Sequence, residues 1–461
     1  MKNLSSTLGL LLLSANLFAQ KFDVDTLMYN GKEANRINYV ILGDGYLETQ
    51  SSKFLADSRK FTNDLFSTSP FREYKAYFNV FSISVPSKEE GAADDPSDLI
   101  DNYFGSTFNY AGIERLLVPT KNDRISQVLA NNYPLYNQVV MLVNSSKYGG
   151  SGGWVATAST NRASSEIAIH ELGHSFAGLS DEYWAGSQYA YESPNMTRES
   201  SRQLVKWKNW IGDFGVDVIS HTGDPSWKKP HNNCKMQYLG APFCSVCKEQ
   251  FVRINQGFVS VIDDYSPQGS TQSDDNNLSL TLITSVPNTL DLSWFLNDER
   301  INHDETSLDI TTLNLDEGNH KIRVDVVDKT LLDRRNMVIV NSVEWNVGIS
   351  IISFIEKQLK NRDDLSVVTN ISGRMDRAKL VLYPNPVQDR IQLEYTSNYY
   401  ENIHIELINS DGKLLKTFDF KTTGPGEHKF DMDTQNYNSG LLYIRVKSKN
   451  LEQTFKVYKV N

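Results

Sequence analysis

Three largely apolar segments in the first third of the chain have the length and composition of buried strands. They span residues 37–42, 78–85 and 139–143. Residues 49–66 and 124–131 instead carry apolar side chains at helical spacing. Because strands alternate with helical segments, this part of the chain predicts an α/β sheet packed on helices.

The pattern changes after residue 275, where short alternating segments follow one another at regular intervals. The first group of predicted strands spans residues 278–283, 289–296, 308–313, 320–327 and 337–345. The second group spans residues 380–383, 390–395, 403–409, 414–420, 428–431, 440–447 and 453–460. Each group predicts a small β-sandwich, the first one Ig-like, and the second is typical of a binding or anchoring module.

These patterns divide the chain into five segments. Residues 1–19 have the features of a secretory signal peptide, with Lys2 before a short apolar run and Ala19 before the expected cleavage point. We expect an α/β domain at 20–265, an Ig-like sandwich at 275–347, a linker at 348–376 and a second sandwich at 377–461.

Composition narrows the functional classes. The 461 residues are 39% hydrophobic and 22% charged, which is typical of globular domains. A formal net charge of −10 argues against a protein that binds nucleic acid or anionic membranes. No apolar run is long enough to predict a transmembrane segment.

The motif H-E-x-x-H at residues 170–174 carries the strongest chemical signal. On a helix it places His170 and His174 one turn apart on the same face, a spacing suited to zinc, with Glu171 placed to act as a base on metal-bound water. The alternative is a surface helix with two exposed histidines. We expect the helix to begin with Ser164 or Ser165 as its cap.

A third zinc ligand is expected just after this helix. Gly178 predicts a left-handed C-cap, which would end the helix and fold the following residues back towards the two imidazoles. Asp181 is then the preferred third ligand, and Glu182 is the second choice. The rival arrangement uses a glutamate on a later element, with Glu192 and Glu199 as the candidates.

All three cysteines lie in one short region, residues 234–247. In an exported protein, a disulfide from Cys234 to Cys244 or Cys247 would fix the turn that contains Met236. A structural zinc site formed by His231 and the three cysteines is the alternative. Met236 would provide an apolar floor under the metal site, unless it is an ordinary core methionine.

The glycine-rich segment at residues 149–153 follows a predicted strand and precedes the H-E-x-x-H helix. It lacks the G-K-[ST] ending of a phosphate-binding loop. We therefore expect either an edge strand and flap beside the helix or a flexible connector.

Four ordered stretches resemble the IgA-peptidase-like family of zinc metallopeptidases, metallopeptidase family 64. They are I-L-G-D-G-Y at 41–46, residues 144–150, residues 170–183, and C-x-M at 234–236 with F-C-x-x-C at 243–247. The resemblance extends over about residues 38–262. It implies a zinc-dependent peptidase in which His170 and His174 bind the metal and Glu171 is the catalytic base.

The layout also resembles the wider metzincin class, in which a glycine turn brings in the third ligand and a methionine turn lies beneath the metal. Gly178-x-x-Asp181 keeps the interval from glycine to ligand. The interval from His174 to Gly178 is one residue longer than in that class, and Asp replaces the usual His. Met236-Gln237-Tyr238 is similar to the astacin-type turn, which implies that Tyr238 approaches the metal or the oxyanion.

The tail at residues 380–461 resembles the C-terminal sorting domain of the type IX secretion system. The matching stretches are Y-P-N-P-V at 383–387, D-G-K at 411–413, S-G-L-L-Y-I at 439–444 and K-V at 456–457. The resemblance implies recognition by that secretion machinery, export across an outer membrane, and release or attachment at the cell surface.

The sequence as a whole predicts a secreted zinc endopeptidase that hydrolyses extracellular proteins or glycoproteins. Its expected fold is an α/β metzincin-like zinc peptidase domain followed by two β-sandwich domains. Zn²⁺ is the expected cofactor, and the expected partners are a protein or peptide substrate and the type IX machinery. The alternative is a catalytically inactive surface adhesin or glycan-binding protein built on a peptidase-like domain.

Overall fold

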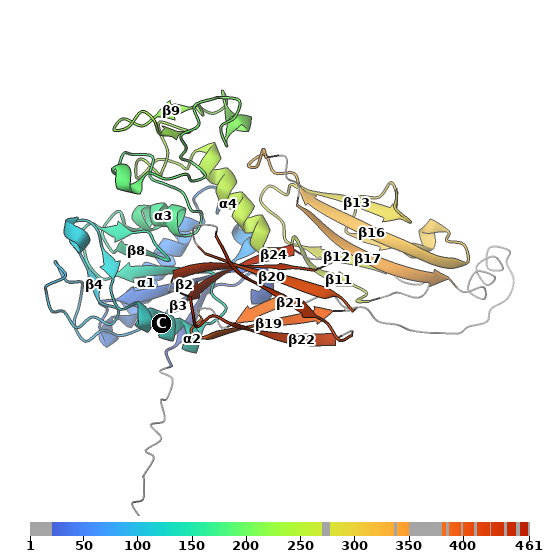
Figure 1. Cartoon of the computed structure of the whole chain (residues 1–461), viewed down its shortest axis with the longest axis horizontal. Helices are drawn as coiled ribbons and strands as arrows, with labels where there is room; N and C mark the ends of the chain where they lie inside the picture. Colours follow the sequence, from blue (N-terminus) through green and yellow to red (C-terminus); the bar gives the residue numbers. More distant parts are fainter. Residues whose placement is uncertain are drawn as a thin grey trace, which may run out of the picture.

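The computed structural model describes residues 21–269, 277–335 and 339–349, and residues 380–459 with gaps at 384–386, 398–399, 410–412, 425, 438–439 and 449–451. The predicted signal peptide at 1–19 and residues 350–376 of the predicted linker lie outside the described residues. Figure 1 shows the described parts along the chain.

A six-stranded mixed sheet forms the centre of the N-terminal region. Its order is β1-β3-β2-β6-β8-β7, and the four inner strands run parallel while the two edge strands are antiparallel to their neighbours. The three predicted apolar strands are confirmed. The strands are β1 (Val24–Met28), β2 (Ile37–Asp44), β3 (Phe78–Ile83), β6 (Gln138–Val143), β7 (Gly150–Ser151) and β8 (Val155–Ser159).

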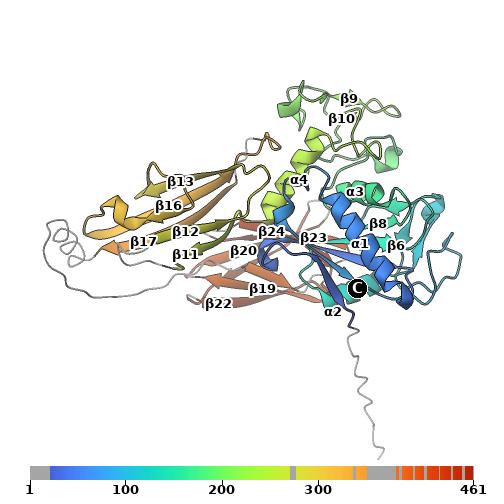
Figure 2. The ribbon, with the colours of Figure 1, turned by 180° about the vertical axis from the view of Figure 1, so that it is seen from behind.

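Helices cover both faces of this sheet, which is why its inner strands are apolar on both sides. Alternate residues of β2 divide between two cores: Tyr39 and Ile41 belong to the one with α1 (Ser51–Leu65) and α3 (Ser164–Ser175). Val40 and Leu42 belong to the other, with α2 (Asn122–Asn132). In both views α2 lies on the opposite side of the sheet from α1 and α3 (Figures 1 and 2).

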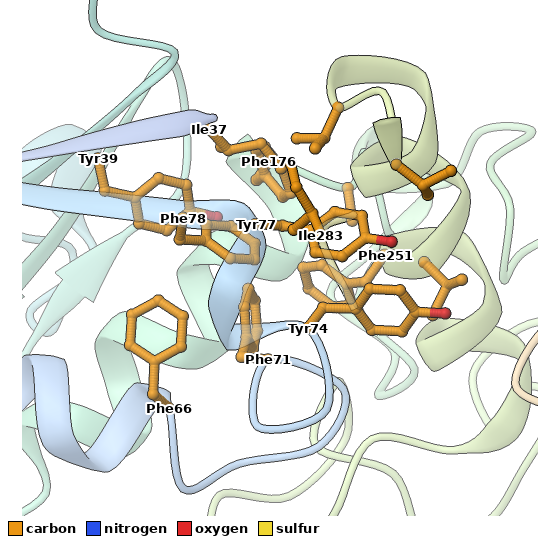
Figure 3. Close-up of a cluster of buried hydrophobic side chains, with 14 of the residues drawn as sticks. Ile37, Tyr39, Phe66, Phe71, Tyr74, Tyr77, Phe78, Phe176, Phe251 and Ile283 are labelled. Carbon is orange, nitrogen blue, oxygen red and sulfur yellow. The ribbon is translucent and has the colours of Figure 1, made fainter. Parts of the chain in front are cut away.

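The core on the α3 side continues into α4 (Ser245–Phe258) through an aromatic cluster. Phe176 lies 5.5 Å from Tyr39 between ring centroids, and Phe71 lies 4.9 Å from Phe251 of α4. Figure 3 shows these rings in one cluster with Ile283, which comes from beyond the sheet region. Helix α4 ends at Phe258, and the chain continues into β11 (Ile262–Ser266).

The first β-sandwich has two antiparallel sheets, ordered β11-β12-β15 and β14-β13-β16-β17. Its strands after β11 are β12 (Asn277–Leu282), β13 (Leu290–Leu296), β14 (Glu299–Arg300), β15 (Ser307–Asp309), β16 (Gly318–Asp328) and β17 (Val340–Ile349). Trp294 and Trp345 stack in its core with centroids 5.8 Å apart. The strand predicted at 308–313 is wrong beyond Asp309, because Ile310–Leu313 forms a 3-10 turn that Asp309 caps.

Polar contacts attach this sandwich to the N-terminal region. The Arg36 guanidinium forms a two-pronged ion pair with Asp263 of β11, at 2.8 Å on each oxygen. Tyr74 donates to Asp328 at 2.7 Å, and Arg335 donates to buried Glu249 of α4 at 2.7 Å. Since apolar residues of both regions also share one core, the two are packed together and not merely tethered.

The C-terminal region forms a second sandwich with sheets β18-β19-β22 and β21-β20-β23-β24. Its strands are β18 (Leu380–Tyr383), β19 (Arg390–Ser397), β20 (Asn402–Asn409), β21 (Leu414–Lys421), β22 (Gly426–Asp433), β23 (Gly440–Lys447) and β24 (Glu452–Lys459). All seven predicted strands are present, and their alternate apolar residues form a separate core. Residues 384–386, 411–412 and 439 of the sorting-domain stretches lie outside the described residues.

Shorter elements complete the described chain. Two small strand pairs, β4 (Ser106–Thr107) with β5 (Val118–Pro119) and β9 (Ile219–Ser220) with β10 (Lys228–Lys229), lie in the long loops of the N-terminal region. Within the described residues, no helix combines the length and the apolar character needed to cross a membrane.

Candidate metal centre

Helix α3 holds the H-E-x-x-H motif against the sheet. Ile167, Leu172 and Phe176 are buried, as expected for its apolar side. The predicted serine cap is wrong: Ala163 is the N-cap residue, and no side chain caps this end. The main chain is instead held by Asn161, whose carbonyl oxygen accepts from Ser164 N at 2.8 Å.

His170, His174 and Asp181 converge on one point. The two imidazole Nε2 atoms are 3.2 Å apart. Asp181 Oδ1 lies 3.1 Å from His170 Nε2 and 3.3 Å from His174 Nε2. Three potential ligand atoms therefore form a nearly equilateral triangle at the end of α3.

Backbone carbonyls determine which imidazole nitrogens are free. His170 Nδ1 donates to the carbonyl oxygen of Lys235 at 2.9 Å, and His174 Nδ1 donates to that of Leu179 at 2.7 Å. A carbonyl oxygen only accepts, so each Nδ1 carries a proton, and in the neutral form of such a ring the lone pair of Nε2 faces Asp181. Three lone pairs that face one another repel unless a cation or a proton lies between them.

The size of this triangle fits zinc. In a tetrahedral site with zinc–ligand distances of about 2.0 Å, neighbouring ligand atoms are separated by about 3.3 Å. The three separations in the structure are 3.1, 3.2 and 3.3 Å. Asp181 Oδ1 is also buried and receives no hydrogen bond from the protein. A three-residue set leaves the fourth tetrahedral position open, as catalytic zinc sites do.

A glycine turn brings the aspartate to the histidines. Gly178 has φ +63°, the left-handed conformation predicted for the end of this helix. Leu179 N then donates back to Gly173 O at 2.9 Å, which reverses the chain direction towards Asp181. The rival ligands lie in other contacts: Glu192 pairs with Lys206, and Glu199 accepts from the main chain of Ser201.

Glu171 lies beside the triangle in a closely packed setting. Burial raises the pKa of its carboxyl group, while His174 and His170 oppose that shift. A Cβ atom added at Gly152 would meet Glu171 Oε2 at 3.0 Å and His174 Cβ at 2.7 Å. The glycine-rich segment therefore passes directly over Glu171. Its strand β7 is at the sheet edge, which confirms the edge-strand interpretation.

Two side chains near the triangle were not assigned a role from the sequence. Arg115 Nη2 donates to the hydroxyl oxygen of Tyr183 at 3.1 Å. Burial raises the pKa of Tyr183 to about 12, and the nearby Asp181 carboxylate adds to the rise. Tyr183 could have been found from the sequence, because it closely follows Asp181. Arg115 could not, because it lies far upstream in a loop without a motif.

Met236 packs against α3, and Tyr238 is largely exposed. A Cβ at Gly173 would meet Met236 Sδ at 2.4 Å, so this methionine packs against α3 where the helix has no side chain. The Tyr238 side chain is 55% exposed. Its role at the oxyanion stays a prediction.

The cysteines form a second buried group instead of the expected disulfide. Cys234, Cys244 and Cys247 are all free thiols. Their fourth neighbour is Glu182, and the four ligand atoms lie within 4.8 Å of one another. The predicted alternative, in which His231 joins the three cysteines, is wrong, because the fourth residue of the group is Glu182. His231 Nε2 instead donates to Phe214 O at 3.1 Å on an exposed loop.

Comparisons with known protein families identify two regions of the chain. Residues 26–216 match the family described as IgA Peptidase M64. Residues 381–460 match the Secretion system C-terminal sorting domain, so the protein is exported and is secreted or held at the cell surface. The first match includes the whole of α3 and Asp181 but ends before the cysteines. Among curated proteins, none matches the chain.

Solved structures resemble parts of the chain only weakly. Dimeric latent PorU from Porphyromonas gingivalis is 14% identical over 43% of this chain and 19% of its own, with a TM-score of 0.16. SGBP-B of Bacteroides ovatus is 14% identical over 44% of this chain and 46% of its own, with a TM-score of 0.14. The chicken interferon gamma receptor alpha chain is 10% identical over 42% of this chain and 96% of its own, with a TM-score of 0.16. Such low scores carry no argument about fold or function.

Proposed function

We propose that this exported protein, which contains an IgA Peptidase M64 region, is a zinc-dependent endopeptidase acting on extracellular proteins or glycoproteins. The catalytic domain would span residues 20–265, with the Ig-like sandwich at 275–347 and the sorting domain at 377–461. The signal peptide at 1–19 and the linker at 348–376 complete this division. The sorting domain would be the part that the type IX machinery recognises.

The convergence of His170 Nε2, His174 Nε2 and Asp181 Oδ1 carries the proposal. Their separations of 3.1–3.3 Å match one face of a tetrahedron around zinc. Both imidazoles are held in the metal-binding tautomer by carbonyl oxygens of Lys235 and Leu179. A pair of solvent-exposed histidines would need neither the tautomer control nor the shared carboxylate.

The residues around the three converging ligand atoms would each have a separate role in hydrolysis. Zinc, when bound, supplies Lewis acidity that polarises the scissile carbonyl and lowers the pKa of water. Glu171 takes the proton of the attacking water and passes it to the leaving amine. Its raised pKa, caused by burial, makes its carboxylate a stronger base than an exposed glutamate.

Arg115 and Tyr183 are placed to stabilise negative charge. The guanidinium of Arg115 contacts the Tyr183 hydroxyl at 3.1 Å, and both groups interact electrostatically with Asp181. We assign Tyr183 as a donor to the oxyanion that forms from the scissile carbonyl, with Arg115 orienting it. Gly152 lets the glycine-rich segment approach Glu171 closely, because a Cβ there would meet Glu171 Oε2 at 3.0 Å.

A metzincin-like arrangement is the architecture that these elements favour. An antiparallel edge strand (β7), a zinc-binding helix (α3), a glycine turn at Gly178 and a packed Met236 follow one another in that order. The departures are the longer interval to Gly178 and the aspartate in place of the usual third histidine. Both departures are compatible with the triangle, because Asp181 reaches both imidazoles.

Cleavage of a proteome-derived peptide library tests this function. The zinc-loaded protein should cut internal peptide bonds, a chelator should abolish cutting, and added zinc should restore it. Cleavage that persists at full rate with the chelator would overturn a zinc mechanism. A zinc-loaded, folded protein that cuts neither peptides nor unfolded proteins would favour the inactive adhesin.

A further inference from the structure

A second group of potential metal ligands lies close to the candidate metal centre, and we call it the thiol cluster. It consists of Glu182, Cys234, Cys244 and Cys247. All four are buried, and their ligand atoms lie within 4.8 Å of one another. They come from the turn after α3, from the turn before Met236, and from the start of α4. None of them takes part in the hydrolysis proposed above.

The distances in the thiol cluster match a tetrahedral metal site. With zinc–sulfur distances of about 2.3 Å, two thiolates on one zinc are about 3.8 Å apart, and a thiolate and a carboxylate oxygen are about 3.5 Å apart. Cys234 Sγ and Cys247 Sγ are 3.7 Å apart. Glu182 Oε1 lies 3.3 Å from Cys247 Sγ and 3.9 Å from Cys244 Sγ.

The surroundings of the thiol cluster are those of a site that holds anionic ligands. Cys244 N donates to Cys234 Sγ at 3.3 Å, and Asn195 Nδ2 donates to Glu182 Oε1 at 3.1 Å. The other oxygen of this carboxylate, Glu182 Oε2, is buried and has no hydrogen-bond partner in the protein. A buried carboxyl oxygen without a partner is costly, and a cation would satisfy it.

A disulfide explains this arrangement less well than a metal. A bond between any two of the cysteines would leave the third thiol and the Glu182 carboxyl group buried together without a disulfide or a cation. An odd number of cysteines with a carboxylate instead makes a complete set of four ligands for a closed, structural zinc site.

We propose that Glu182, Cys234, Cys244 and Cys247 bind a second zinc ion with a structural role. This inference does not depend on the proposed peptidase activity. The site has four protein ligands and no exposed side, so it has no position for a substrate. Binding displaces the thiol protons to solvent, and the metal is Zn²⁺ before and after, so no oxidant or reductant is needed.

The second ion would fix parts of the candidate active site. Glu182 is bonded in the chain to Asp181, the third ligand of the first triangle. Cys234 precedes Lys235, whose carbonyl oxygen accepts from His170 Nδ1 at 2.9 Å. Glu182 N also donates to Met236 O at 2.8 Å. The structural zinc thus joins the third ligand, the carbonyl that orients His170 and the packed methionine in one unit.

Metal and thiol counts on the purified full-length protein test the proposal. We expect two zinc ions per chain, and three alkylated cysteines after denaturation with chelator but without reductant. The His170→Ala/His174→Ala variant should keep one zinc, and Cys247→Ser should lose one. His231→Ala is the matched control and should keep two. Cobalt loaded into the double-histidine variant should show the intense near-ultraviolet absorption of thiolate coordination.

Each result bears on the two sites separately. One alkylated cysteine in the wild type, with the other two in a disulfide, would overturn the second zinc site. So would a double-histidine variant that folds and holds no metal. A wild-type protein that holds the thiol-bound zinc but cuts no peptide would count against the proposed function alone. The wild-type thiol count keeps the test decisive if Cys247→Ser does not fold.

Discussion

Asp181 and Glu182 are consecutive residues whose carboxylates enter different sites. Asp181 Oδ1 lies 3.1 Å from His170 Nε2, whereas Glu182 Oε1 lies 3.3 Å from Cys247 Sγ. The bend that follows the Gly178 turn directs the two neighbouring side chains to different sites. One dipeptide therefore lies between the open triangle and the closed thiol cluster.

Removing the Asp181 carboxylate should release the catalytic zinc. Loss of a residue that only orients a metal ligand weakens metal binding by roughly 10- to 100-fold. Because Asp181 would itself be a ligand, we expect Asp181→Ala to weaken zinc binding at the triangle by more than that. Competition with a chromogenic chelator measures this affinity. Glu192→Gln and Glu199→Gln, which alter the rival ligands, should leave it unchanged. A large loss in either control would restore the rival arrangement.

A single methyl group at Gly152 should impair hydrolysis without removing zinc. The Cβ of Gly152→Ala would meet His174 Cβ at 2.7 Å and Glu171 Oε2 at 3.0 Å. We expect kcat/KM to fall by about ten- to a hundredfold, because the base and one ligand must shift. Gly153→Ala is the matched control, since its Cβ would come no closer than 4.0 Å to Val155 O. Equal rates for the two variants would contradict the placement of Gly152 over the base.

Two tyrosines compete for the role of oxyanion donor. Tyr183→Phe removes a hydroxyl that contacts Arg115 beside the triangle, and kcat/KM should fall by about tenfold or more at unchanged zinc content. Tyr238→Phe alters an exposed side chain and should have little effect. Steady-state kinetics on one peptide substrate decides between them. The reverse ranking would support the assignment suggested by the astacin-type turn.

The Arg36–Asp263 pair should contribute pH-dependent stability at the sandwich contact. Hydrogen bonds from Arg36 lower the pKa of Asp263. A folded pKa below the unfolded value of about 3.9 stabilises the fold above that pH, and the contribution is lost as pH falls through the folded pKa. Asp263→Asn should lower the free energy of unfolding by about 3 kcal/mol at pH 7, because it leaves buried Arg36 unpaired. The difference from wild type should shrink in acid.

Denaturant unfolding at several pH values measures this contribution. Lys321→Met is a useful control, because its ion pairs with Asp298 and Glu344 are surface contacts. Such pairs contribute about 0–1 kcal/mol. A loss for Asp263→Asn no larger than that of the control would show that the Arg36 pair does not hold the two regions together.

Local patterns predicted most of the elements correctly. The apolar runs at 37–42 and 139–143 became β2 and β6, and all seven strands of the tail are present. Strict alternation over several residues marks a strand clearly, because one face is buried and the other is not. The predicted strand failed at Ile310–Leu313, because this segment is a 3-10 turn that Asp309 caps. The alternation of apolar residues does not reveal such a turn.

The parts of the triangle and of the thiol cluster that depend on long-range contacts could not be predicted from the sequence. The spacing of His170 and His174 follows from helix geometry alone, and Gly178 marks the turn towards Asp181. The fourth member of the thiol cluster comes from a segment about fifty residues before Cys234, and chain proximity wrongly favoured His231. Arg115 reaches Tyr183 through tertiary packing, and no local pattern announces it.

Hydrolysis by the Glu171→Gln variant tests whether Glu171 is the base of a zinc peptidase. Glutamine has nearly the same shape as glutamate but does not accept the proton of the attacking water. With zinc content equal to the wild type, we expect peptide cleavage to fall by about a hundred- to ten-thousandfold. A zinc-loaded Glu171→Gln protein that cleaves at the wild-type rate would contradict the account.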